Sequence, residues 1–509
     1  MQATYALVLI AMAAIAAPGA AGVTLYPGPP GEPSSLDYAV TVNGKPCFCY
    51  TSYRFDTTST TTIQGRPVSP LSFCYFDSDG PVDIEVKMLD GLRKAGIDRS
   101  GVVVRPLAHG IRPGVTDHTA RFRVPGGPCQ LSVEPGGSIQ HPLHIFVNPP
   151  ERDAPDPKDP NVLYFGPGVH EASEVDIKDG QTAYIAGGAI VSLKPQPAGT
   201  KMGSSQLYGL DLFWAPGLFV PKWHKRVTVR GRGILCGRKA LEQRQRGALL
   251  VFEGCEDVTV EGIIIRESAV WSLNLSNCKR ARISNVKIVG HYVNNDGIAI
   301  GGTSDAVVED CFCHNADDSL EVKVWIPQRN VLFRNCVVWS DVGQSLGLAC
   351  ETDADIENVV FENCTVLHST DDMASRGVIG LHLVGHGAAR GFRFENIVVE
   401  DARGPRRPAL KVFNNWDDWH LNYPTRPDSP YELLNPPARN KPNGSIRDVV
   451  FRNVRVLQSR NSDVVLMADG AASPIEGVTF ENVEINGTKL KPGDPRLKTN
   501  AWVRDVEVR

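Results

Sequence analysis

A short motif recurs along the second half of this 509-residue chain and limits the folds available to it. Strong copies are "FRNCVV" from Phe333, "FENCTV" from Phe361, "FENIVV" from Phe394, "FRNVRV" from Phe451 and "FENVEI" from Phe480, and weaker copies start at Val260, Ile283 and Val308. Successive copies start 23 to 33 residues apart, except for one step of 57 residues. Repeats of this length indicate stacked supersecondary units.

Each copy alternates apolar and polar residues, which is the periodicity of a β-strand. Such strands cannot bury a face alone, but parallel strands coiled on one another share a continuous interior. The repeats therefore predict a right-handed parallel β-helix over residues 160–509. The recurring asparagine suits a stacked turn, because asparagine tolerates left-handed backbone and its amide can bond the next coil. It occurs at Asn335, Asn363, Asn396, Asn453 and Asn482.

The chain before the repeats is organised differently. Residues 1–22, "MQATYALVLIAMAAIAAPGAAG", read as an export signal, with an uncleaved membrane anchor as the alternative. Residues 23–150 hold alternating strands between Gly/Pro turns, which predicts an antiparallel β-sandwich. A Pro-rich linker, Pro149–Pro160, leads into the repeats. We therefore expect an all-β protein that is secreted or periplasmic, with no membrane segment once the signal is removed.

Charge and cysteine usage exclude several classes of partner. The formal net charge is −4, so no basic field is available for nucleic acid. The twelve cysteines include no CxxC pair, and several recur at one repeat position: Cys278, Cys311, Cys336 and Cys364. This favours free thiols in a core over disulfides or zinc. We expect no metal and no cofactor, and the oligomeric state is open.

Three carboxylates stand at similar positions of successive repeats. Asp296 lies in "NNDG", 13 residues after the repeat start at Ile283, and Asp317 and Asp318 lie 9 and 10 residues after Val308. Parallel strands stack about 4.8 Å apart, so the three should gather on one face, and at least one should have a raised pKa. A protonated acid beside ionised carboxylates suits hydrolysis of a glycosidic bond. The spacing alone leaves an ordinary turn or surface role open.

"NNDGI" followed one coil later by "ADDSLEVK" resembles the active-site pattern of β-helical polysaccharide hydrolases. These are the polygalacturonases of glycoside hydrolase family 28 and the dextranases and isopullulanases of family 49. "ESAVWSLNLSNCKRARISNVKIVG", from Glu267 to Gly290, resembles the segment before the first aspartate, and the β-sandwich favours the dextranase group. The resemblance implies inverting hydrolysis of O-glycosidic bonds in a polysaccharide. Asp317 would protonate the leaving oxygen, and Asp296 and Asp318 would activate water.

Two departures from the polygalacturonase pattern bear on the substrate. Polygalacturonases carry Gly-His-Gly after the doublet, whereas this chain has "VGQSLGL" with Gln344. They also carry an Arg-x-Lys that holds the substrate carboxylate, whereas "SRGVIGLHL" offers only Arg376 and His382. An anionic sugar needs a charge-assisted partner, so a neutral glycan or one with another acidic group is favoured.

Further residues are candidates for binding sugar. The predicted substrate-binding set is Asn294, His291, Lys323, Trp325, Gln344, Glu351, Arg376 and His382. His314 falls near the same groove, and the aromatic rings of Trp339, Trp416 and Trp419 could stack on pyranose faces. Each of these side chains could equally be a core or surface residue. The sugar, the linkage and endo or exo action are not indicated.

Two other functions fit a chain of this kind. A calcium-dependent polysaccharide lyase would use the acidic cluster to bind Ca²⁺ and a Lys or Arg to abstract a proton from a uronic acid. A non-catalytic glycan-binding β-helix would keep the aromatic residues but would have no need for carboxylates in phase. The fold alone does not decide among them.

Overall fold

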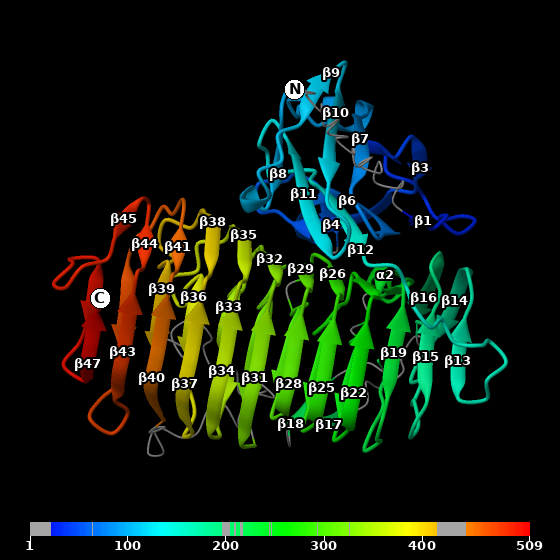
Figure 1. Ribbon diagram of the computed structural model, residues 1–509. Coiled ribbons are helices and arrows are strands. Elements are labelled where there is room, and N and C mark those ends of the chain that lie inside the picture. Colours follow the sequence, from blue (N-terminus) through cyan, green and yellow to red (C-terminus); the bar gives the residue numbers. More distant parts are fainter. Residues whose placement is uncertain are drawn as a thin grey trace, which may run out of the picture.

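The computed structural model describes residues 22–63, 65–195, 204–207, 210–213, 217–243, 245, 247–292, 294–324, 326–414 and 444–509. A β-sandwich sits beside a long parallel β-helix, above the middle of the helix in the view of Figure 1. The predicted all-β fold class, a right-handed parallel β-helix after a β-sandwich, is confirmed. Met1–Ala21 of the expected leader and the 415–443 stretch lie outside the described residues. The three expected domains, 1–22, 23–150 and 160–509, stay predictions.

Three sheets form the walls of the β-helix. Sheet 1 contains β13 (Val162–Phe165), β15 (Thr182–Ile185), β19 (Thr228–Gly231), β22 (Glu256–Glu261), β25 (Lys279–Ser284), β28 (Ser304–Glu309), β31 (Gln328–Arg334), β34 (Ile356–Glu362), β37 (Ala388–Glu395), β40 (Ser445–Arg452), β43 (Ile475–Glu481) and β47 (Val503–Val508). Sheet 2 contains β14 (Gly168–Ala172), β16 (Ala189–Leu193), β20 (Ile234–Cys236), β23 (Ile264–Arg266), β26 (Lys287–Val289), β29 (Phe312–Asn315), β32 (Val337–Ser340), β35 (Thr365–Ser369), β38 (Val398–Ala402), β41 (Arg455–Val456), β44 (Glu484–Ile485) and β45 (Thr488–Lys489).

Sheet 3 carries the strands that follow the turn after sheet 2. It contains β21 (Leu250–Glu253), β24 (Leu273–Ser276), β27 (Ile298–Gly301), β30 (Leu320–Val324), β33 (Leu346–Thr352), β36 (Ile379–His382), β39 (Leu410–Phe413), β42 (Val464–Met467) and β46 (Leu497–Thr499). A hairpin, β17 (Ser204–Leu207) and β18 (Leu210–Phe213), and one short helix, α2 (Arg238–Glu242), complete the described elements of this part.

The repeated motif stacks side chain on like side chain along sheet 1. Phe333 stacks on Phe361 with ring centroids 4.6 Å apart, and the series continues through Phe394, Phe451 and Phe480. The recurring asparagines have positive φ, and Asn453 donates from Nδ2 to Oδ1 of Asn396 over 2.9 Å. All twelve cysteines lie in the described residues, and each is buried and free. The expected parallel stacking, asparagine turns and core thiols are confirmed.

The β-sandwich consists of two sheets around their own apolar core. One sheet holds β1 (Val23–Leu25), β4 (Tyr50–Phe55), β5 (Thr62–Ile63), β6 (Arg66–Ser78), β8 (Val102–Arg105), β11 (Cys129–Pro135) and β12 (Leu143–Asn148). The other holds β2 (Tyr38–Val42), β3 (Lys45–Cys47), β7 (Val82–Met88), β9 (Gly114–Thr116) and β10 (Thr119–Val124), with α1 (Asp90–Lys94) and η1 (Leu107–His109) in the connections. The expectation of a purely antiparallel sandwich is wrong in one respect. Strand β12 lies between β11 and β6 and runs parallel to β6.

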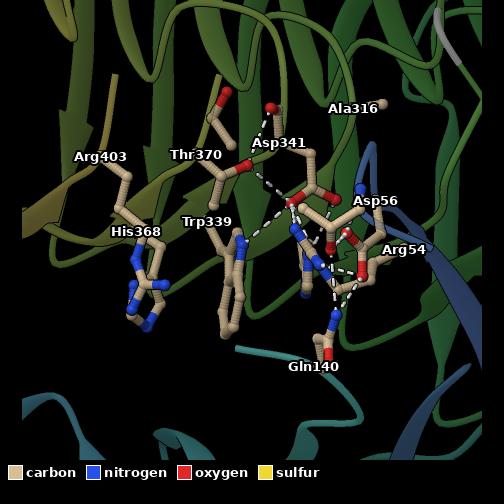
Figure 2. A network of polar contacts seen from close by, with 12 residues as sticks. Arg54, Asp56, Gln140, Ala316, Trp339, Asp341, His368, Thr370 and Arg403 are labelled. Carbon is tan, nitrogen blue, oxygen red and sulfur yellow. Dashed lines mark hydrogen bonds and ion pairs between the residues drawn. The ribbon is translucent and has the colours of Figure 1, made fainter. Parts of the chain in front are cut away.

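The sandwich packs on the outer face of sheet 2 through an apolar patch and a buried polar network. Phe146 of the sandwich meets Phe312 of β29 with ring centroids 5.0 Å apart. Arg54 pairs with Asp341 over 2.7 Å, and both side chains are almost completely buried. Figure 2 shows this network, in which the indole N–H of Trp339 also donates to Asp341 over 3.1 Å. The sandwich is therefore fixed beside the turn that joins sheet 2 to sheet 3.

No helix among the described residues is both long and apolar enough to cross a membrane.

Candidate active site

The three predicted aspartates meet at the turn between sheet 2 and sheet 3. Asp296 precedes β27, and Asp317 and Asp318 precede β30, the neighbouring strand of the same sheet. The backbone N–H of Gly297 donates to the carbonyl of Asp318 over 2.8 Å, so Asp296 and Asp318 occupy equivalent positions of adjacent coils. One coil spacing, about 4.8 Å, separates their backbones.

Asparagine and glycine shape this turn. The side chain of Asn295 accepts the N–H of Ala316 over 2.9 Å, and Asn315 donates to the carbonyls of Asp317 and Asp318 over 2.8 and 3.0 Å. A Cβ on Gly343, in the next coil, would lie 2.1 Å from the nitrogen of Asp318. The turn of the next coil can therefore approach the aspartate pair only because that residue is glycine.

Asp318 is held as an anion. It is buried, accepts the backbone N–H of Gln344 over 2.6 Å and forms an ion pair with Arg376. Burial pushes its pKa upward, but Arg376, Lys323 and the Gln344 N–H together lower the pKa to about 2. Asp318 therefore stays ionised at any ordinary pH.

Asp296 is buried in a cluster of charges around Lys323. The Lys323 ammonium lies 2.5 Å from Asp296, 3.0 Å from Glu321 and 3.6 Å from Glu351, and 4.0 Å from the centroid of the Trp271 ring. Burial raises the pKa of Asp296 to about 6, and Asp318 adds to the rise while Lys323 opposes it. Asp296 therefore changes its charge near neutral pH.

Asp317 is the member of the trio that remains partly exposed. Its carboxylate accepts the backbone N–H of Asp318 over 3.0 Å. Burial raises the pKa of Asp317 well above its ordinary value, and repulsion from Asp296 and Asp318 adds to this. The expected raised pKa is confirmed, although burial contributes more to it than the like charges do. The trio thus combines an accessible proton donor with an anion and a group that titrates near neutrality.

The other predicted sugar-binding residues differ in how close they lie to the trio. Lys323, Gln344, Glu351 and Arg376 contact the trio or its partners, and the Gln344 side-chain amide donates to the carbonyl of Gly380 over 3.0 Å. His382 lies on β36 and stacks on Phe413, and burial lowers its pKa well below the ordinary value. Asn294 is partly exposed in the turn before Asp296. Trp325, Trp416 and Trp419 lie outside the described residues.

Three predicted residues contact the sandwich instead of the carboxylates. His291 is buried with its ring edge-on to Tyr53, with centroids 5.8 Å apart. His314 and Trp339 are fully buried and stack on each other beneath the sandwich. Their burial leaves no ring face for a pyranose, so these three side chains pack the interface with the sandwich.

Sequence reasoning missed two residues of the cluster, Glu321 and Trp271. Glu321 is buried on β30, and burial raises its pKa well above the ordinary value. It lies two residues before Lys323, so strand alternation already placed both on one face of β30. Trp271 lies two residues before β24, as Asp296 does before β27, so the repeat phase could have identified it.

Among the described residues, no group of three or more His, Cys, Asp or Glu side chains is arranged to hold a metal ion.

Residues 234–405 match the model of glycosyl hydrolases family 28. The chain is 22% identical to polygalacturonase QRT2 of Arabidopsis thaliana over 46% of its own length and 49% of the relative, and 24% identical to isopullulanase of Aspergillus niger over 54% of each. It thus spans about half the length of these curated relatives. The solved structure of Dex49A from Penicillium minioluteum superimposes with a TM-score of 0.63 at 16% identity, covering 96% of both chains. The predicted resemblance to the β-helical hydrolases of families 28 and 49 is confirmed.

Proposed function

We propose that this protein is a secreted glycoside hydrolase that cleaves O-glycosidic bonds of a polysaccharide. The observation that carries the proposal is the coil-to-coil trio of Asp296, Asp317 and Asp318, with an accessible protonated acid beside a fixed anion. The match of residues 234–405 to a glycosidase family supports the same conclusion from sequence.

The three aspartates take different roles in the proposed reaction. Asp317 donates its proton to the leaving oxygen, because its raised pKa keeps it protonated and it is the accessible member. Asp296 accepts a proton from the attacking water, because a base with a pKa of about 6 is stronger than an ordinary carboxylate and is ionised at neutral pH. Asp318 cannot accept that proton readily, so it orients the water and stabilises positive charge on the sugar.

We further propose that the reaction inverts the anomeric configuration. Carboxylates one coil apart lie closer than the separation of about 6.5–9.5 Å usual for inverting enzymes. Inversion requires water to attack the anomeric carbon opposite the leaving oxygen. In the proposed arrangement Asp296 and Asp318 hold one water there, and Asp317 protonates the leaving oxygen from beside the bond, so the acid and the base can be closer than in the usual pair. The resemblance to families 28 and 49 favours this arrangement.

A neutral glycan suits the site better than an anionic one. Arg376 is engaged by Asp318, and Lys323 by three carboxylates. Arg407 donates to the carbonyl of Val342 over 2.9 Å, and Lys411 to the carbonyl of Ser375 over 3.0 Å. A sugar carboxylate would have to displace one of these contacts and approach an acidic cluster, which is unfavourable.

The proposal is tested by incubating the protein with dextran, pullulan and polygalacturonate. We expect new reducing ends from one of the neutral polymers, and NMR recorded before mutarotation should show the inverted anomer first. Retained configuration would overturn the mechanism. A product that absorbs in the ultraviolet through a new double bond, formed only without chelator, would show a lyase. Binding without any cleavage would show a glycan-binding module.

The pH dependence follows from the same groups. Asp296 must be ionised and Asp317 protonated, so kcat/KM should rise with pH through about 6 and fall again at higher pH as Asp317 loses its proton. Because Lys323 lowers the pKa of Asp296, Lys323→Met should move the acid limb to higher pH, whereas Lys323→Arg should leave it nearly in place. Initial rates from pH 4 to 10 measure both limbs. An unmoved acid limb in Lys323→Met would contradict the role given to Asp296.

A further inference from the structure

A row of turn residues leads away from the carboxylates along the axis of the β-helix. The backbone N–H of Asp341 donates to the carbonyl of Asn315 over 3.0 Å. In the next coil the backbone N–H of Thr370 donates to the carbonyl of Ser340 over 3.1 Å. In the same way, the backbone N–H of Arg403 donates to the carbonyl of Ser369 over 2.9 Å, and that of Arg460 to the carbonyl of Ala402 over 3.1 Å. Asp341, Thr370, Arg403 and Arg460 therefore form one row, here called the turn row, with a step of about 4.8 Å per coil. The row starts one coil from Asp317.

The sandwich supplies a wall opposite the turn row. A cavity of about 420 Å³ lies between the turn row and the sandwich residues Arg54, Asp56 and Gln140. Figure 2 shows these side chains converging below Ala316, the residue before Asp317. A second cavity of about 400 Å³ is lined by residues of the β-helix that include Arg403, Arg460 and Asn486. Both cavities are lined by Arg403 and Arg460, so they are adjacent along the turn row and are together called the groove here.

The groove offers fixed hydrogen-bonding groups, and its lining carries charges of both signs. Arg54 holds Asp341 over 2.7 Å, and Asp401 holds Arg403 over 2.6 Å. Gln140 donates from Nε2 to Thr58 Oγ1 over 3.0 Å, which orients its amide at the rim. Paired charges of this kind present donors and acceptors for hydroxyl groups without favouring an ion of either sign. Ile139 and Pro405 add apolar surface for the carbon face of a sugar ring.

We propose that this groove binds the part of a neutral polysaccharide that extends from the cleavage point toward the C-terminal coils. The sandwich would then contribute to recognition of polymer length as well as to stability. This inference rests on the proposed hydrolase function, because the groove is placed relative to the carboxylate trio.

The test compares a long and a short substrate of the same linkage. Gln140→Ala and Arg460→Ala each remove one hydrogen-bonding group from opposite walls, and neither residue belongs to the carboxylate cluster. Each variant should raise KM for the polymer about tenfold, which corresponds to one charge-assisted or two neutral hydrogen bonds, with kcat unchanged. KM for a trisaccharide should stay at the wild-type value. Arg390→Ala is the matched control, because Arg390 is an exposed arginine on sheet 1, ion-paired with Glu357 over 3.1 Å.

The outcomes separate this inference from the proposed function. Suppose that hydrolysis is intact and that the wild type and both groove variants each have the same KM for the polymer as for the trisaccharide. The groove proposal would then be wrong, and the hydrolase proposal would stand. If the wild type cleaves none of the polymers, affinity electrophoresis in gels containing dextran, pullulan or polygalacturonate still tests whether the groove binds a polysaccharide. If a neutral polymer retards the wild type but not the two groove variants, the result would support polysaccharide binding in the groove even though the hydrolase proposal fails. Selective retardation by polygalacturonate, or no retardation by any of the three polymers, would overturn it.

Discussion

Asp317→Asn is expected to lower kcat/KM on the cleaved polysaccharide by about 10²–10⁴-fold, the usual contribution of general acid catalysis. The amide cannot donate a proton to the leaving oxygen, and a sugar alkoxide is a poor leaving group. An aryl glycoside with an acidic phenol needs little protonation, so the variant should recover most of its activity on such a substrate. Hydrolysis of the polymer and of the aryl glycoside, measured side by side, gives the ratio that defines the role of Asp317.

The matched variants make this result specific. Asp296→Asn and Asp318→Asn should lose activity on both substrates, because water activation is needed whatever the leaving group. Asp305→Asn is the control, since Asp305 is an exposed aspartate on β28 that accepts the Asn330 amide over 2.8 Å, away from the trio. If Asp317→Asn loses the same activity on both substrates, Asp317 is not the general acid. If the aryl glycoside rescues Asp296→Asn instead, Asp296 is the acid and Asp317 acts on the water.

Arg54→Ala is expected to lower the free energy of unfolding by about 3–5 kcal/mol. Arg54 and Asp341 are 2.7 Å apart with 2% and 0% of their side chains exposed, so the variant leaves a carboxylate buried without its cation. Replacing both partners, in Arg54→Met with Asp341→Leu, should recover part of the loss, because the Asp341 carboxylate is then gone while buried Asp56 still loses its ion pair with Arg54. Urea titrations of the wild type, the single variant and the double variant give the three free energies.

An exposed ion pair provides the comparison. Arg390→Ala breaks a pair in which both side chains are 52% exposed, so it should cost about 0–1 kcal/mol. A cost for Arg54→Ala in the same range would mean that water reaches the sandwich interface and that Asp341 is solvated there.

The β-helix was predictable because its signal is repeated within the sequence. The same Phe and Asn return in each of the five strong copies, and in the structure they stack on their own copies. The carboxylate trio was predictable for the same reason, since position within the repeat determines position on the face. Glu321 and Trp271 carried the same information, but their residue types suggested packing or solvent exposure.

The docking of the sandwich had no comparable local signal. Arg54 and Asp341 are 287 residues apart, and neither sequence neighbourhood specifies the other. One part of the interface was nevertheless visible, because His314, Trp339 and His368 pair across successive strands of sheet 2. Aromatic residues on the outer face of consecutive coils indicate that something covers that face. The pattern does not say which part of the chain covers it, because many surfaces could bury those rings.

The strand ladder passes unchanged across the longest interval between repeats. Phe394 and Phe451 are 57 residues apart, yet they pair in the same register as neighbours separated by a single short turn, and Asn453 still bonds Asn396. The coil therefore tolerates a large insertion at its turn without any change in the scaffold. The connection between two coils can therefore change length while the three aspartates keep their spacing.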